Sequence, residues 1–163
     1  MTVDAADARA RSLAVATSLF LMTASFVLIK TGRDALYFQG RGLFDLPIAY
    51  IGLALLSLPA AAVVLGSIHW LGARRARVVV ALAAAVLIAA FYPVARPGGG
   101  GLMTFFFMLV PLLFGVLFSL TWLLASDLLD GIQHSELGPL YSIVGAASIL
   151  GGVAGGGAAR AAA

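Results

Sequence analysis

Long apolar runs separated by short polar segments make up most of the chain. An α-helix needs about 20 apolar residues to cross the hydrocarbon core of a bilayer. Five runs approach or exceed that length, at residues 13–29, 48–69, 78–94, 102–126 and 139–158. Residues 1–11 are polar and mixed in sign, and we expect a short solvated leader there. The pattern predicts an all-α integral membrane protein, a single bundle over residues 1–163 with about five transmembrane helices.

The composition supports the same class of protein. Of the 163 residues, 62% are hydrophobic and only 10% are charged, whereas a soluble domain has about 25% charged residues. The formal net charge of +3 is spread over several loops rather than gathered in one patch. Basic residues so placed are typical of membrane topology, so we expect the lipid bilayer as a partner and no nucleic acid. The absence of cysteine excludes disulfides and thiol chemistry.

Two cations and a carboxylate stand at the end of the first apolar run. If the helix continues through them, Lys30, Arg33, Asp34 and Tyr37 fall at i, i+3, i+4 and i+7 and share one face. Lys30 and Asp34 can then pair, which leaves Arg33 less neutralised. Ionisable groups next to hydrocarbon often mark a functional site. The alternative is that Lys30 and Arg33 only reach out to the membrane surface.

Other polar groups offer less chemistry. The segment 126–138 is interpreted as a solvated loop, and its Asp127, Asp130, His134 and Glu136 match no zinc-ligand spacing. No nucleophile and base stand together within the predicted spans. We therefore expect no metal site, no cofactor and no enzymatic activity.

Small residues recur every four positions in the last predicted span. They form two neighbouring lines: Ala147, Gly151 and Gly155, and beside them Ser148, Gly152 and Gly156. Lines of this kind let two membrane helices approach closely enough for backbone packing. We expect this span to pack inside a bundle rather than to face lipid on all sides.

The distribution of basic residues predicts the orientation of the chain in the membrane only once Lys30 and Arg33 are assigned to a loop or to the membrane region. The segment with Arg74, Arg75 and Arg77 is so short that the second and third spans must be antiparallel. Lys and Arg divide equally between the two sides of a five-span protein, five on each. If Lys30 and Arg33 belong to the membrane region, the positive-inside rule places the N-terminus in the cytoplasm.

Two segments resemble the nucleotide transporters typified by the ATP/ADP antiporters of plastids and obligate intracellular bacteria, in the major facilitator clan. The first is LIKTGRDALYF, in which Lys30, Arg33 and Asp34 stand at the basic and acidic positions of the first-helix motif of that family. The second is Trp122 followed by PLYSIVGAASILGG, which is similar to the connection between the fourth and fifth helices and to the fifth helix.

The resemblance implies the N-terminal helical bundle of a transporter whose twelve helices form two related halves, with substrate bound between them. The chain would move an anionic solute such as a nucleotide across the inner membrane by alternating access, only with a second helical bundle or another copy. Lys30, Arg33, Asp34 and Tyr37 are the predicted substrate-binding residues, with Arg33 handling phosphate groups. The alternative function is a non-transporting interaction or anchoring module that packs through its Gly-rich fifth helix.

Overall fold

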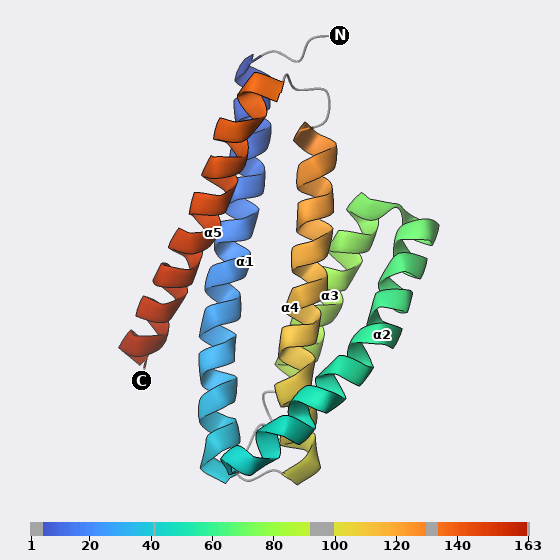
Figure 1. Cartoon of the computed structure of the whole chain (residues 1–163), viewed down its shortest axis with the longest axis vertical. Helices are drawn as coiled ribbons and strands as arrows, with labels where there is room; N and C mark the ends of the chain where they lie inside the picture. The colour runs from blue at the N-terminus through green and yellow to red at the C-terminus, as the bar shows by residue number, and fades with distance from the viewer. Residues whose placement is uncertain (1–4, 41, 92–99, 130–133, 163) are drawn as a thin grey trace. The chain divides into compact units, whose positions relative to one another are not determined.

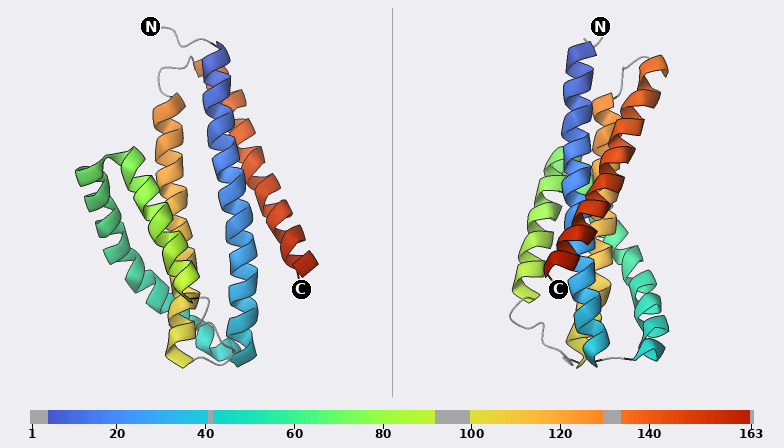
Figure 2. Two further views of the ribbon diagram at one scale, coloured as in Figure 1. Left: turned by 180° about the vertical axis from the view of Figure 1, so that it is seen from behind. Right: turned by 90° about the vertical axis from the view of Figure 1, so that its left-hand side faces the viewer.

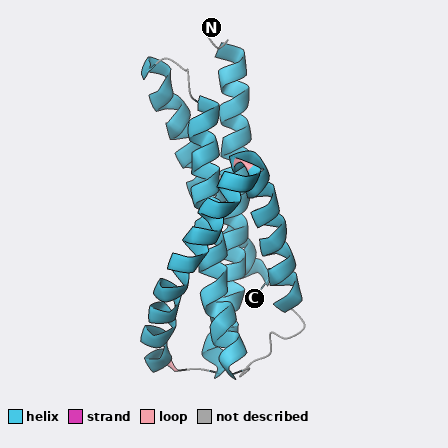
Figure 3. Cartoon of the chain, turned by 90° about the vertical axis from the view of Figure 1, so that its right-hand side faces the viewer, coloured by secondary structure: helices cyan, strands magenta, loops and turns pink. Residues whose placement is uncertain are grey.

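The computed structural model describes residues 5–40, 42–91, 100–129 and 134–162. Its elements are α1 (Ala5–Gly40), the 3-10 helix η1 (Leu43–Asp45), α2 (Leu46–Leu71), α3 (Ala73–Phe91), α4 (Gly100–Leu129) and α5 (His134–Ala162). Every element of the described part of the chain is helical, as the colouring of Figure 3 shows. The predicted all-α architecture is confirmed.

Four of the helices are long and apolar enough to cross a membrane. The qualifying stretches are Arg9–Gly40, Leu46–Leu71, Gly100–Leu129 and Gly138–Ala162. In hydrocarbon every backbone polar group must be satisfied within the protein, and an α-helix does so along its whole length. The chain is a multi-pass helical membrane protein.

The third predicted span, residues 78–94, differs from the other four. The helix at this place is α3, which starts earlier, at Ala73, and is described up to Phe91. Every stretch of 18 residues within α3 includes Arg74, Arg75 and Arg77, so α3 is not among the helices that qualify as spans. The predicted end of this span, residues 92–94, lies outside the described residues.

The helices extend into segments that were predicted as the leader and as loops. Residues 5–11 belong to α1, because their alanines and arginines are strong helix formers; residues 1–4 of the predicted leader lie outside the described residues. The segment 126–138 is also shorter as a loop than predicted, because α4 continues to Leu129 and α5 begins at His134.

The chain divides into two compact units. The first comprises Met1–Leu28 and Phe118–Ala163, and the second comprises Ile29–Leu117. The bundle predicted as single is therefore described unit by unit. Both α1 and α4 contribute to each of the two units.

The first unit has a small apolar core. It is made of the buried residues Val15, Ala16, Leu19, Ala125 and Val144, with Met22, Phe118, Leu128 and Ala147 packed against them. In this unit α5 runs along the first part of α1, as Figures 1 and 2 both show. The three contributing helices are α1, α4 and α5.

The second unit contains the rest of α1, all of α2 and α3, and the first part of α4. Its buried aromatic residues include Tyr37, Phe106 and Phe107, and the ring of Phe91 stacks on Phe106 at 5.0 Å. Gly72 joins α2 to α3 with a φ of 76°, a value that favours glycine. Its N–H donates to the Ile68 carbonyl at 2.9 Å. The two helices fold back on each other as a hairpin (Figure 1).

Candidate functional site

Helix α1 continues without a break through the charged cluster, so Lys30, Arg33, Asp34 and Tyr37 lie along one stripe of it. All four belong to the second unit. Burial differs sharply among them: the side chain of Arg33 is 5% exposed and that of Lys30 is 50% exposed. Tyr37 is fully buried. A nearly buried guanidinium in a membrane helix needs partners, and these decide what the cluster can do.

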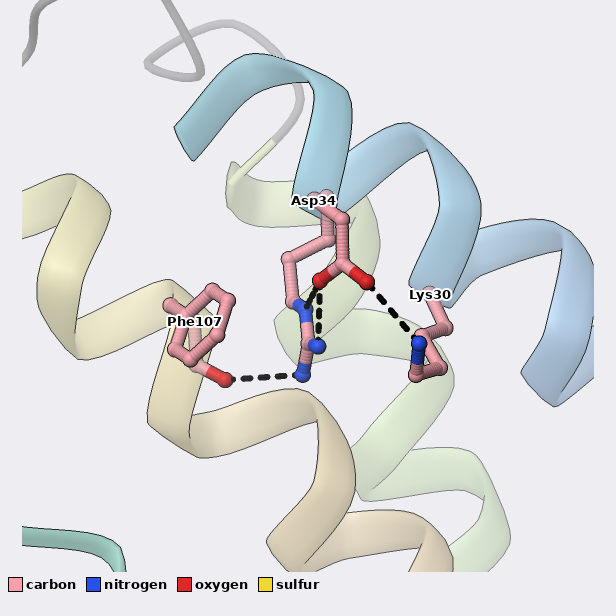
Figure 4. Close-up of polar contacts among 4 residues, drawn as sticks. Lys30, Asp34 and Phe107 are labelled. Atoms are coloured by element: carbon pink, nitrogen blue, oxygen red, sulfur yellow. Dashed lines mark hydrogen bonds and ion pairs between the residues drawn. The ribbon is translucent and has the colours of Figure 1, made fainter. Parts of the chain in front are cut away.

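The carboxylate of Asp34 pairs with both cations (Figure 4). Lys30 Nζ lies 2.9 Å from Asp34 Oδ2, and Arg33 Nε donates to Oδ1 at 2.9 Å. Arg33 Nη2 also donates to Oδ1. The predicted pair of Lys30 with Asp34 is therefore confirmed, whereas the expectation that this pair leaves Arg33 less neutralised is wrong, because Arg33 binds the same carboxylate. A carboxylate has two acceptor oxygens and can serve both groups. Its one negative charge balances only one of the two positive charges, so the cluster keeps a net positive charge.

Phe107 of α4 is the second partner of Arg33. Arg33 Nη1 donates to the Phe107 carbonyl oxygen at 2.9 Å. A dashed line in Figure 4 marks this bond at the labelled Phe107. The guanidinium carbon also stands 4.1 Å from the centroid of the Phe107 ring, a geometry in which the ring face attracts a cation. The ring of Tyr37 packs on Phe107 at 4.3 Å. We call Lys30, Arg33, Asp34, Tyr37 and Phe107 the Arg33 site.

Two hydroxyl groups of the second unit are buried without a hydrogen-bond partner among the described residues. They are Tyr37 Oη on α1 and Thr104 Oγ1 on α4. Thr104 precedes Phe107 by three positions, so the two lie on the same face of α4. Buried polar atoms are usually hydrogen-bonded, so these two hydroxyl groups are exceptions within the second unit.

Phe107 and Thr104 are not among the substrate-binding residues predicted from the sequence. Both lie in the apolar start of α4, where nothing in the pattern of hydrophobic positions distinguishes them. A signal for Phe107 was present in Pro111, four residues later, because a proline inside a helix frees the carbonyl four residues before it.

The small-residue line Ala147, Gly151 and Gly155 lies against α1 in the first unit. Ala147 packs on the apolar core. A Cβ added at Gly151 would stand 3.0 Å from Phe20 Cα and closer still to the Phe20 carbonyl oxygen. At Gly155 it would meet the backbone of Ala24 in the same way, 2.9 Å from Cα. The two helices therefore approach backbone to backbone at these glycines.

The second line, Ser148, Gly152 and Gly156, lies beside the same stretch of α1. Ser148 Oγ and Thr23 Oγ1 share a hydrogen bond of 3.0 Å. A Cβ at Gly152 would be 3.6 Å from Thr23 Cγ2, and one at Gly156 would be 4.0 Å from Val27 Cγ1, both ordinary contacts. Both lines face a helix of the same chain.

Acidic and histidine side chains do not gather elsewhere in the part of the chain that the structure describes. Within it, no group of three or more His, Asp or Glu residues is placed to hold a metal ion. Asp130 lies outside the described residues, and the side chains of His134 and Glu136 are likewise not described.

Comparison with known proteins adds no relative, since no protein-family model, no curated protein and no solved structure matches the chain.

Proposed function

We propose that the chain is a transporter component of the cell inner membrane, in which the Arg33 site receives an anionic solute. A second helical bundle or another copy of the chain supplies the opposite wall, and alternating access moves one bundle against the other. In this proposal Lys30 and Arg33 belong to the membrane region, and by the positive-inside rule the N-terminus is then cytoplasmic.

The nearly buried guanidinium of Arg33 is the observation that carries the proposal. Arg33 is nearly buried, and it shares its only described carboxylate, Asp34, with Lys30. Charged side chains within membrane helices are unfavourable, and those that are retained commonly serve a substrate or ion pathway. An anion at the site would supply the missing negative charge. Lys30, half exposed, offers it a first contact.

The resemblance of LIKTGRDALYF to the nucleotide transporters supports the same assignment. It makes a phosphate-bearing solute such as a nucleotide the first one to test. The planar fork of a guanidinium suits phosphate oxygens, and an ammonium beside it adds a point charge.

The alternative, an anchoring module that binds a partner through the Gly-rich helix, would need the small-residue lines to be open. In the structure Gly151 and Gly155 lie against the backbone of α1 instead. The geometry therefore favours an intramolecular role for these lines, and we do not propose the alternative.

Cysteine protection tests the proposal, and the chain has no native cysteine to interfere. A thiol at Lys30→Cys, with Arg33 retained, is expected to react with a small aqueous reagent and to be protected by ATP or inorganic phosphate. Gln39→Cys is the matched control, because Gln39 is exposed on α1 but lies off the stripe that carries Lys30. Protection should disappear when Arg33→Met is added to Lys30→Cys. Equal reactivity with and without these anions at position 30 would refute the anion site.

A further inference from the structure

The Phe107 carbonyl lacks its helical donor. In an α-helix the N–H of residue i donates to the carbonyl of residue i−4, and the residue four positions after Phe107 is Pro111. Proline has no N–H. In the structure Arg33 Nη1 donates to the Phe107 oxygen at 2.9 Å. The guanidinium of α1 therefore takes the place of the backbone donor that Pro111 removes from α4.

Arg33 is held on three sides by groups of its own chain. Nε and Nη2 donate to Asp34, Nη1 donates to Phe107, and the plane lies over the Phe107 ring. A guanidinium has five N–H donors, and these bonds use three of them. An anion that binds Arg33 through its fork must displace some of these bonds.

We propose that Pro111 is a positioning residue that makes the Phe107 carbonyl an internal competitor for the anion at Arg33. The competition rests on the proposed function, whereas the holding of Arg33 does not. When Arg33 turns to an anion, the Phe107 carbonyl has neither a side-chain nor a helical donor. Since a buried carbonyl without a donor is unfavourable, Arg33 alternates between α4 and the anion, and occupation of the site loosens α1 from α4.

A double-mutant cycle tests the holding of Arg33 without any ligand. Pro111→Ala restores an N–H for the Phe107 carbonyl, and Arg33→Met removes the guanidinium. We expect Arg33→Met to lower the unfolding midpoint of the full chain in lipid nanodiscs by about 4 °C. In the Pro111→Ala background the decrease should be less than half as large. If the changes in unfolding midpoint caused by Pro111→Ala and Arg33→Met simply added in the double variant, Pro111 would not be a positioning residue for Arg33.

Pro59 provides the matched control for that cycle. It lies inside α2 and likewise frees the carbonyl four residues before it, but the hydrogen bonds of Arg33 go to Asp34 and Phe107 and not to that carbonyl. Pro59→Ala and Arg33→Met should therefore combine additively. If Pro59→Ala reduced the effect of Arg33→Met on the unfolding midpoint as much as Pro111→Ala does, the coupling would not be specific to Pro111. That result would overturn the proposal.

The competition is tested with ATP as the probe, through protection of the Lys30→Cys thiol. Adding Pro111→Ala should lower the half-protecting ATP concentration about tenfold, because Arg33 no longer leaves an unsatisfied carbonyl behind. Pro59→Ala should leave it unchanged. An unchanged value with Pro111→Ala would overturn the competition and leave the anion site intact. If ATP protects no variant while the cycle is coupled, the proposed function and the competition both fail, and Pro111 still positions Arg33.

Discussion

The side chain of Arg33 reaches α4 because of its shape as well as its charge. Its fork contacts Asp34 on one side and the Phe107 carbonyl on the other. The ammonium of a lysine is a compact point charge on a flexible stem and cannot span both acceptors while stacking on a ring. At this position, therefore, arginine and lysine are not equivalent.

We predict that Arg33→Lys destabilises the chain by about 1–2 kcal/mol, because one charge-assisted hydrogen bond and the stacking on Phe107 are lost. Thermal unfolding in lipid nanodiscs measures the change. Lys30→Arg is the control at the half-exposed partner of the same carboxylate, where about 0.5 kcal/mol or less is expected. Equal effects of the two substitutions would mean that charge alone matters.

The hydroxyl of Tyr37 is buried without a partner among the described residues. Tyr37→Phe keeps the ring contact with Phe107 and removes a polar atom that is away from water. We predict unchanged stability or a gain of up to about 1 kcal/mol, measured by the same unfolding experiment. A clear loss would show that the hydroxyl is bonded in the membrane, and loss of ATP protection at position 30 would place it at the solute.

At the residue scale, the sequence predicted contacts within one helix better than contacts between helices. The Lys30–Asp34 pair followed from their spacing of four along α1. The contact of Arg33 with Phe107 joins residues that are 74 positions apart, and neither charge nor periodicity indicates which carbonyl a buried arginine meets. Only the proline after Phe107 carried that information.

At the scale of elements, the close approach of α5 to α1 depends on glycine at two positions. A methyl group at Gly151 would overlap the backbone of Phe20, which cannot move aside as a side chain can. Gly157, on the same helix, is exposed and has no neighbour within 4 Å of an added Cβ. A comparison of alanine at Gly151 with alanine at Gly157 therefore distinguishes the effect of helix packing on stability from the effect of helix propensity.

We predict that Gly157→Ala raises the free energy of unfolding by up to about 1 kcal/mol, the usual gain of alanine over glycine within a helix. Gly151→Ala should lower it instead, by about 1–3 kcal/mol, because α1 and α5 must move apart. Unfolding midpoints of the two variants in one detergent give the comparison. Stabilisation by both would mean that α5 does not pack on α1 through Gly151.

Element boundaries followed the sequence where the apolar runs were bordered by turns, and failed where helix-forming residues continued past them. The second run matches α2 closely, because Pro47 stands in the first turn of the helix and Gly72 follows its last residue. By contrast, α1 extends to Gly40 past Lys30 and Arg33. A hydropathy pattern predicts that a span ends where charged residues begin. The helix itself can continue past them, because charged side chains do not interrupt the backbone hydrogen bonds.

At the scale of the whole molecule, the direction of insertion depends on which cations count as loop charges. Arg9, Arg11, Arg74, Arg75 and Arg77 belong to the side of the N-terminus if α1 and α2 cross the membrane in turn. On the opposite side, Lys30 and Arg33 lie within α1 and are paired with Asp34, so they do not count as loop charges. Arg41 is then the basic residue that remains between α1 and α2 in the sequence. The excess of positive charge on the N-terminal side of this pair of helices then supports the proposed cytoplasmic N-terminus.

We predict that the two ends of α2 label from opposite sides of the membrane. His69 and Gly42 are both exposed and stand near opposite ends of this helix. A thiol at Gly42→Cys should react with an impermeant maleimide in intact cells, whereas one at His69→Cys should react only after permeabilisation. Replacing Arg74, Arg75 and Arg77 by glutamine removes three of the five basic residues on the N-terminal side and should make a fraction of His69→Cys reactive from outside. Labelling of His69→Cys in intact cells without those replacements would reverse the orientation, and would place the half-exposed Lys30 of the Arg33 site towards the cytoplasm.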